Sequence, residues 1–144
     1  MPRVLVAGKI HHRGIDLLRS AEGIDVDYVE AISLDSYLPF IEHADALLVR
    51  TQPVPAEAIS RASRLRIVSR HGVGYDSVDV AALNRRGIPL AVVGDVNSRA
   101  VAEHTMLLLL TTAKRLPRYD AAVRGGDWNY RNSLEATNSM ASGS

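Results

Sequence analysis

The sequence contains no cysteine, few aromatic residues and no long hydrophobic run. The absence of cysteine excludes disulfides and thiol chemistry, and it fits a cytoplasmic protein. The longest apolar run, at 106–110, is far too short to span a bilayer, so we expect no membrane partner. The formal net charge is +1 without a basic run, which gives no case for nucleic-acid binding.

Short apolar segments alternate with stretches of helical spacing along residues 1–96. The apolar segments are 4–7, 24–28, 46–49, 65–68 and 88–93. This alternation predicts a five-stranded parallel sheet with helices on both faces. Right-handed crossovers then favour a doubly wound, flavodoxin-like α/β fold. Ligands of such sheets bind beyond the carboxyl ends of the strands.

A glycine-containing stretch, Ser69–Asp79, follows the fourth of these segments. Gly72 and Gly74 permit backbone angles that side chains forbid, and they let a ligand approach the main chain. We expect this loop to enter a helix at 78–85, whose free N–H groups would attract an anion beside Arg70. The alternative is a plain tight turn. The other strand ends carry Gly8-Lys9, Arg50-Thr51 and Gly94-Asp95. Their glycines and positive charges favour an anion site for a carboxylate or a phosphate.

The character of the chain changes after the last predicted strand. Asn97 stands at the start of a long predicted helix, 101–116, which Pro117 closes. Apolar residues cover most of the circumference of this helix, so it needs burial on more than one side. We expect a second short helix at 119–123. The tail, 132–144, ends in small polar residues and is predicted to be disordered or non-native.

Two other kinds of site are weighed and set aside. The run Gly72-Val73-Gly74-Tyr75-Asp76-Ser77 is a near miss to the dinucleotide-binding fingerprint, but Ser77 replaces the third glycine and the loop follows the fourth strand. We therefore expect no cofactor-binding residue there. The histidines lack a partner at a useful helical spacing, and the pair His11-His12 is expected to face solvent, so no metal site is predicted.

An ordered series of motifs resembles the D-isomer-specific 2-hydroxyacid dehydrogenases, particularly the phosphoglycerate dehydrogenase branch. The matching segments are Leu48-Val49-Arg50-Thr51, Arg70-His71-Gly72-Val73-Gly74-Tyr75-Asp76-Ser77-Val78-Asp79, Ala81-Ala82-Leu83, Gly87-Ile88-Pro89, Asn97-Ser98-Arg99-Ala100-Val101-Ala102-Glu103-His104 and Gly125-Gly126-Asp127-Trp128. Together they cover roughly residues 3–135.

The resemblance implies a division of roles. Residues 1–96 would form the substrate-binding (catalytic) domain, and 97–131 the hinge and first helices of a nucleotide-binding domain. In this family the glycine loop binds the substrate carboxylate through backbone N–H groups, two arginines lie near the substrate, and the long helix packs at a dimer interface. The substrate-binding set that we carry over is Arg50, Arg70, His71, Gly72, Val73, Gly74 and Asn97.

The family's Rossmann fingerprint and its catalytic arginine, glutamate and histidine match nothing in this sequence. We therefore expect a truncated NAD-dependent dehydrogenase that has no catalytic residue, binds NAD weakly at most and is inactive alone. The expected partners are a small 2-hydroxy or 2-oxo acid and a second copy of the chain, bound through 101–116. Arg50 and Arg70 favour a phosphorylated or dicarboxylic acid. The alternatives are a stand-alone anion-binding module and a self-associating, domain-swapped fragment.

Overall fold

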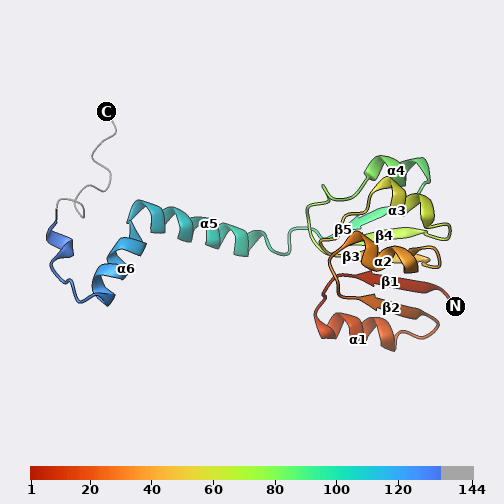
Figure 1. The fold of residues 1–144 in the computed structure, drawn as a ribbon, viewed down its shortest axis with the longest axis horizontal. Coiled ribbons are helices and arrows are strands. Elements are labelled where there is room, and N and C mark those ends of the chain that lie inside the picture. Colours follow the sequence, from red (N-terminus) through yellow and green to blue (C-terminus); the bar gives the residue numbers. More distant parts are fainter. Residues whose placement is uncertain (134–144) are drawn as a thin grey trace. The chain divides into compact units, whose positions relative to one another are not determined.

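The computed structural model describes residues 1–133 of the chain (Figure 1). The chain divides into two compact units, Met1–Asp95 and Val96–Ser144. Most of the tail predicted at 132–144 lies outside the described residues. The assignment of the two units to a substrate domain and a nucleotide-binding domain stays a prediction.

The first unit is a five-stranded parallel sheet with four helices, as the sequence predicts. In chain order its elements are β1 (Arg3–Ala7), α1 (His12–Ser20), β2 (Asp25–Val29), α2 (Leu34–Ile41), β3 (Ala46–Val49), α3 (Ala56–Arg61), β4 (Ile67–Arg70), α4 (Val80–Arg85) and β5 (Leu90–Val92). The strand order β2-β1-β3-β4-β5 is that of a flavodoxin-like sheet. The predicted fold class is therefore confirmed.

Helices cover both faces of this sheet. Leu5, Leu47 and Val68 occupy one register row, and all three are buried in the main core. The same core contains side chains of α2, α3 and α4, among them Tyr37, Ile59 and Leu83. Val6 on β1 and Ile15 on α1 are buried outside this cluster, and α1 contacts β2. Thus α1 covers the opposite face.

The α1 face is covered unevenly. Leu48 on β3 is only half-buried, and Ile67 on β4 is 39% exposed. Their strand neighbours Leu47 and Val68 point to the other face and are almost fully buried. Parallel sheets are ordinarily buried on both faces. The stretch of β3 and β4 on the α1 face is therefore a partly exposed apolar surface.

The second unit consists of helices. Helix α5 (Ser98–Ala113) is followed by α6 (Leu116–Arg124) and a 3₁₀ turn at Tyr130–Asn132. The predicted end of the long helix at residue 116 is wrong: the helix stops at Ala113, and Arg115 adopts a left-handed backbone with φ 50°. Pro117 explains this break, since a proline in a continuous helix would clash with the carbonyl four residues earlier, at Ala113.

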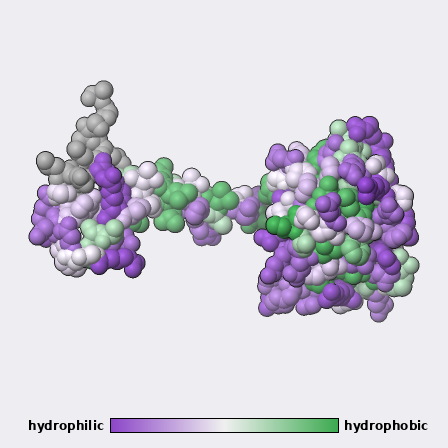
Figure 2. Space-filling model, viewed as in Figure 1, coloured by the Kyte–Doolittle hydropathy of each residue, from purple (hydrophilic) through white to green (hydrophobic). Residues whose placement is uncertain are grey.

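No residue of α5 is buried. Its large apolar side chains are all roughly half exposed: Val101, Met106, Leu107, Leu108, Leu109 and Leu110. Figure 2 shows hydrophobic surface along this helix. Among the described helices, none combines the length and the apolar character that crossing a membrane requires.

Asp45 ties the starts of three strands together. Its Oδ2 accepts a hydrogen bond from the backbone N–H of Arg3 at 2.8 Å, and the Arg64 guanidinium lies 3.0 Å from the same oxygen. Its own backbone N–H donates to Arg3 O and its carbonyl accepts from the N–H of Arg66. The Arg3 N–H, followed by Arg64, holds the pKa of the Asp45 carboxyl below its ordinary 3.8.

We expect Asp45→Asn to lower the free energy of unfolding at neutral pH and to do so less in acid. A carboxylate whose pKa is depressed in the folded state stabilises the fold above its unfolded pKa, and it loses this contribution as the pH falls through the folded pKa. Urea unfolding of both proteins from pH 7 to pH 3 measures the difference, which should shrink below about pH 4. A difference independent of pH would contradict this role.

Candidate functional site

Backbone pairing continues one residue beyond two strands at the carboxyl edge of the sheet. Arg50 N donates to Ala7 O at 3.0 Å, and His71 N donates to Val49 O at 2.8 Å. Arg50 and His71 therefore extend the β1–β3–β4 ladder side by side. The order β2-β1-β3 places Arg50 at the point where the sheet reverses its winding, which is where open α/β sheets bind ligands.

Arg50 reaches across this edge. One guanidinium nitrogen, Nη1, donates to Lys9 O at 2.9 Å, and the residue is exposed. A guanidinium carries five N–H donors. Its remaining donors have no partner within residues 1–133, so Arg50 keeps positive charge and hydrogen-bonding capacity for a ligand.

Arg70 folds back over the glycine loop. Its Nη1 donates to His71 O at 2.5 Å, and its half-buried side chain leaves Nε without a hydrogen-bond partner. Gly72 has φ +153°, and a Cβ there would lie 2.6 Å from Arg70 Nη1. The guanidinium thus occupies the space that a side chain at position 72 would need.

The loop itself presents a row of backbone donors. Gly72 is anchored through its N–H to Arg70 O at 2.8 Å and through its carbonyl to Val93 N at 3.2 Å. In the described part of the chain, the N–H groups of the next three residues, Val73, Gly74 and Tyr75, donate to nothing. Val73 and Tyr75 are about half exposed. These three successive N–H groups follow Arg70, His71 and Gly72 in the loop and are free to donate hydrogen bonds to an anion.

The predicted helix start is wrong. Helix α4 begins at Val80, and the Asp79 carboxylate caps it by accepting from Ala82 N at 2.8 Å. Before the helix the chain pairs with Val54, which donates to Ser77 O and accepts from Asp79 N. The helix N-terminus therefore faces its own capping carboxylate and adds nothing to the anion site. A dinucleotide cradle needs the glycine loop to open a helix directly, so this loop does not fit NAD.

One buried residue at this edge escapes prediction. Gln52 is fully buried, and it is the one buried polar side chain within residues 1–133. Its Oε1 accepts from Thr51 N at 3.0 Å, and its Nε2 donates to Ala31 O at 3.0 Å. The amide lies against Gly8, which has φ +105°. A polar residue just after a strand end is ordinary in sequence, so no pattern distinguishes it.

Asn97 belongs to the second unit. It stands at the N-cap position of α5, where its carbonyl accepts from Val101 N at 2.9 Å and its side chain makes no capping bond. The structure therefore brings together Arg50, Arg70 and the loop 71–74 within the first unit. The place of Asn97 beside them stays a prediction.

The family model of the D-isomer-specific 2-hydroxyacid dehydrogenase catalytic domain matches residues 4–143. The chain belongs to this family. It is 35% identical over 127 residues to D-3-phosphoglycerate dehydrogenase of Archaeoglobus fulgidus, covering 88% of this chain and 24% of that protein. It is 35% identical over 132 residues to glyoxylate reductase of Thermococcus onnurineus, covering 90% of this chain and 40% of that protein.

Solved structures of other proteins are also similar to this chain. The NADPH-dependent glyoxylate/hydroxypyruvate reductase of Sinorhizobium meliloti, crystallised with NADP and malonate, has a TM-score of 0.79 and 28% sequence identity, covering 99% of this chain and 44% of that one. A Thermus thermophilus protein gives a TM-score of 0.77 at 32% identity, covering 88% of this chain and 41% of that one. The chain thus spans less than half the length of each of these four proteins.

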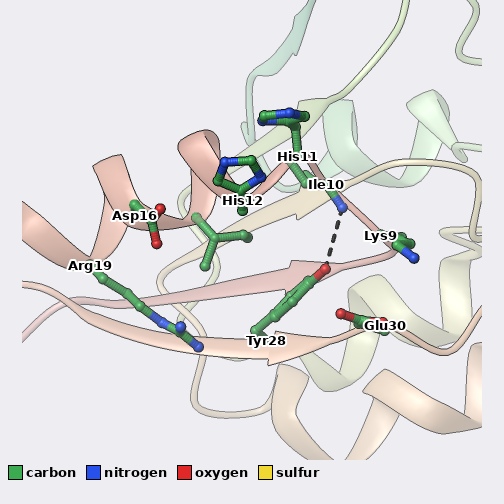
Figure 3. Close-up of a pocket in the computed structure, with 9 residues that line it drawn as sticks. Lys9, Ile10, His11, His12, Asp16, Arg19, Tyr28 and Glu30 are labelled. Atoms are coloured by element: carbon green, nitrogen blue, oxygen red, sulfur yellow. Dashed lines mark hydrogen bonds between the residues drawn. The ribbon is translucent and has the colours of Figure 1, made fainter.

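A hollow of about 360 Å³ lies between α1 and the end of β2, and Lys9 is one of the residues that line it (Figure 3). Tyr28 forms its floor, and its hydroxyl accepts from Ile10 N at 3.4 Å. Lys9 and Arg19 on the lining are balanced by Asp16 and Glu30. Because the charges of the lining cancel, the hollow does not favour an anion as the glycine loop does.

The adjacent histidines lie at this hollow. His11 and His12 are exposed, as predicted, and their ring centroids are 4.1 Å apart. His11 Nδ1 accepts from Arg13 N at 3.3 Å at the start of α1. Within the part of the chain that the structure describes, no group of three or more histidine, cysteine, aspartate or glutamate side chains could hold a metal ion.

We expect Gly8→Ala to lower the free energy of unfolding by about 2–5 kcal/mol, because a left-handed backbone costs alanine about 1–2 kcal/mol and the Gln52 amide must be displaced from its bonds. A Cβ at position 8 would lie 2.6 Å from Gln52 Oε1 and 2.8 Å from Nε2. Urea unfolding measures the loss.

Gly23→Ala is the matched control for this substitution. Gly23 also has a positive φ, +82°, but nothing lies within 4 Å of a Cβ there. This variant should lose only the backbone cost, about 1–2 kcal/mol. Equal losses at both positions would show that the contact between Gly8 and the Gln52 amide contributes nothing to the free energy of unfolding.

Proposed function

We propose that this chain is the substrate-binding part of an NAD-dependent D-2-hydroxyacid dehydrogenase, an oxidoreductase, and that it binds the carboxylate of a small 2-hydroxy or 2-oxo acid. The observation that carries the proposal is the row of unpaired N–H groups at Val73, Gly74 and Tyr75 beside Arg70. Charged hydrogen bonds from such a row suit a carboxylate, which offers two oxygens to several donors. Membership of the family supports this assignment.

Two arginines at one edge favour a substrate with a second anionic group. The loop N–H groups would hold one carboxylate, and Arg50 or Arg70 would meet a phosphate or a second carboxylate. One relative is a D-3-phosphoglycerate dehydrogenase, and one solved family member was crystallised with malonate. We therefore propose a phosphorylated or dicarboxylic acid as the substrate class.

The proposed role is binding and orientation. In the reaction of the family, nicotinamide cofactor accepts or donates the hydride, and a general base takes the proton of the substrate hydroxyl. The glycine loop does not fit that cofactor. We assign no general base among the residues of the carboxyl edge. We propose that these 144 residues fix the acid by its carboxylate but do not transfer hydride by themselves.

Isothermal titration calorimetry tests the site with three acids: 3-phosphoglycerate, malonate and glycolate. 3-Phosphoglycerate and malonate should bind more tightly than glycolate, because only they carry a second anionic group and so engage both the loop and an arginine. Arg70→Gln should weaken 3-phosphoglycerate binding by roughly 10- to 100-fold, the usual worth of a charge-assisted hydrogen bond. Arg66→Gln removes the same charge from an exposed residue before β4 and should change the affinity little.

Two results would refute this proposal. The absence of heat with all three acids would remove the binding function. Equal loss of affinity in Arg70→Gln and Arg66→Gln would show that the effect comes from net charge and not from the glycine loop.

A second copy of this chain is the protein partner that we propose. The observation in favour is the apolar surface of α5, none of whose residues is buried. An apolar patch of this kind marks an interaction surface in most proteins. Self-association through α5 would bury leucines on more than one side of the helix. The resemblance to the family implies a dimer in which the corresponding helix packs at the interface.

Sedimentation velocity over a range of concentrations tests this association. The chain should sediment as a dimer or larger species, and Leu107→Glu combined with Leu110→Glu should shift it to monomer, because the buried interface would then hold two unpaired carboxylates. Lys114→Glu, which places a carboxylate at the end of the same helix, is the control. A monomer at all concentrations would contradict the proposal.

A further inference from the structure

The side-chain amide of Gln52, just beyond the end of β3, is buried, and its burial needs an explanation. Gln52 has no exposed surface, although a glutamine side chain is normally solvated. Both of its polar atoms are paired, one with the backbone before it and one with the chain that follows β2. A buried amide satisfied in this way fixes the groups that it bonds, because breaking either bond leaves an unpaired polar atom in the core.

The Gln52 amide joins three strand ends. It accepts from Thr51 N just after β3, and it donates to Ala31 O two residues after β2. It also covers Gly8, the residue that follows β1, where a Cβ would come within 2.6 Å of Oε1. Gly8 in turn donates its N–H to Val29 O at 2.8 Å. Gln52 thus fastens β1, β2 and β3 to one another at the carboxyl edge.

Arg50 lies between these fixed points. Its N–H is held by Ala7 O, and the next peptide N–H, that of Thr51, is held by Gln52 Oε1. Its Cβ is 3.0 Å from where a Gly8 Cβ would stand, and its guanidinium donates to Lys9 O. Without the Gln52 amide, the peptide after Arg50 could rotate and the end of β3 could leave its place in the ladder, and the Arg50 Cα–Cβ bond would move with that strand end.

We infer that Gln52 is a positioning residue for Arg50: its buried amide fixes the backbone that aims the Arg50 guanidinium at the anionic group of the substrate. This inference rests on the proposed function for the role of Arg50, and on the geometry alone for the fixing of its backbone. Gln52 does not touch the substrate. A purely structural Gln52 would stabilise the fold without any preference for Arg50.

A double-mutant cycle with Gln52→Met and Arg50→Gln separates the two roles. Methionine matches the length of glutamine but removes both hydrogen bonds. In the chain with Arg50, Gln52→Met should weaken 3-phosphoglycerate binding about tenfold, within the range of couplings between neighbouring residues. In the Arg50→Gln chain the same substitution should change the affinity less than about twofold. Equal weakening in both chains would overturn the inference.

Ile41→Val is the control for stability. Ile41 is fully buried in α2, and its truncation lowers the free energy of unfolding without touching the β3 end. Its affinity for 3-phosphoglycerate should remain that of the unchanged chain. Where Gln52→Met does not fold, Gln52→Asn serves in its place, because its shorter side chain keeps an amide but does not reach Ala31 O.

Amide hydrogen exchange decides the inference even where no acid binds, a result that would refute the proposed function alone. Gln52→Met should speed exchange of the Arg50 and Thr51 amides about tenfold relative to Val68, whose N–H is held by Pro89 O just before β5. Unchanged protection of Arg50 and Thr51 would overturn the inference, and selective acceleration would support it without reference to the ligand.

Discussion

The site depends on backbone pairing that runs past the ends of the strands. Ala7 O and Val49 O accept N–H groups from Arg50 and His71, so residues that would otherwise belong to loose loops share the register of the sheet. This pairing needs no particular side chain. It sets the cationic groups and the glycine loop along one edge, and side-chain chemistry then acts at positions that the backbone has fixed.

Two glycines let other groups occupy the space a Cβ would fill. At Gly8 this group is the buried amide of Gln52, and at Gly72 it is the guanidinium of Arg70. In each case a polar side chain approaches the main chain more closely than any other residue type at that position would allow. The first contact fastens three strand ends, and the second brings a positive charge against Gly72 at the start of the glycine loop.

Much of this arrangement follows from the sequence. Apolar runs such as 46–49 are too short for helices and end in turn residues, so the parallel sheet is predictable, and with it the edge at which Arg50 and Arg70 meet. Competition between backbone pairing and helix formation in a short segment is harder to predict from the sequence. Asp79 caps α4 only because the chain first pairs with Val54, and this pairing moves the helix start to Val80. The burial of Gln52 is unpredictable for another reason: it depends on Gly8 and Ala31, which are far from it in the sequence.

We propose that the N–H groups of Val73, Gly74 and Tyr75 bind a carboxylate, and every role given to this edge of the sheet follows from that contact. The most direct measurement is an amide ¹⁵N–¹H NMR titration of the chain with malonate. We expect the largest shifts on these three amides and smaller ones at Arg50 and His71, all saturating together. Saturable shifts centred on the His11–Arg19 side of the sheet, or no saturable shift in the glycine loop, would contradict it.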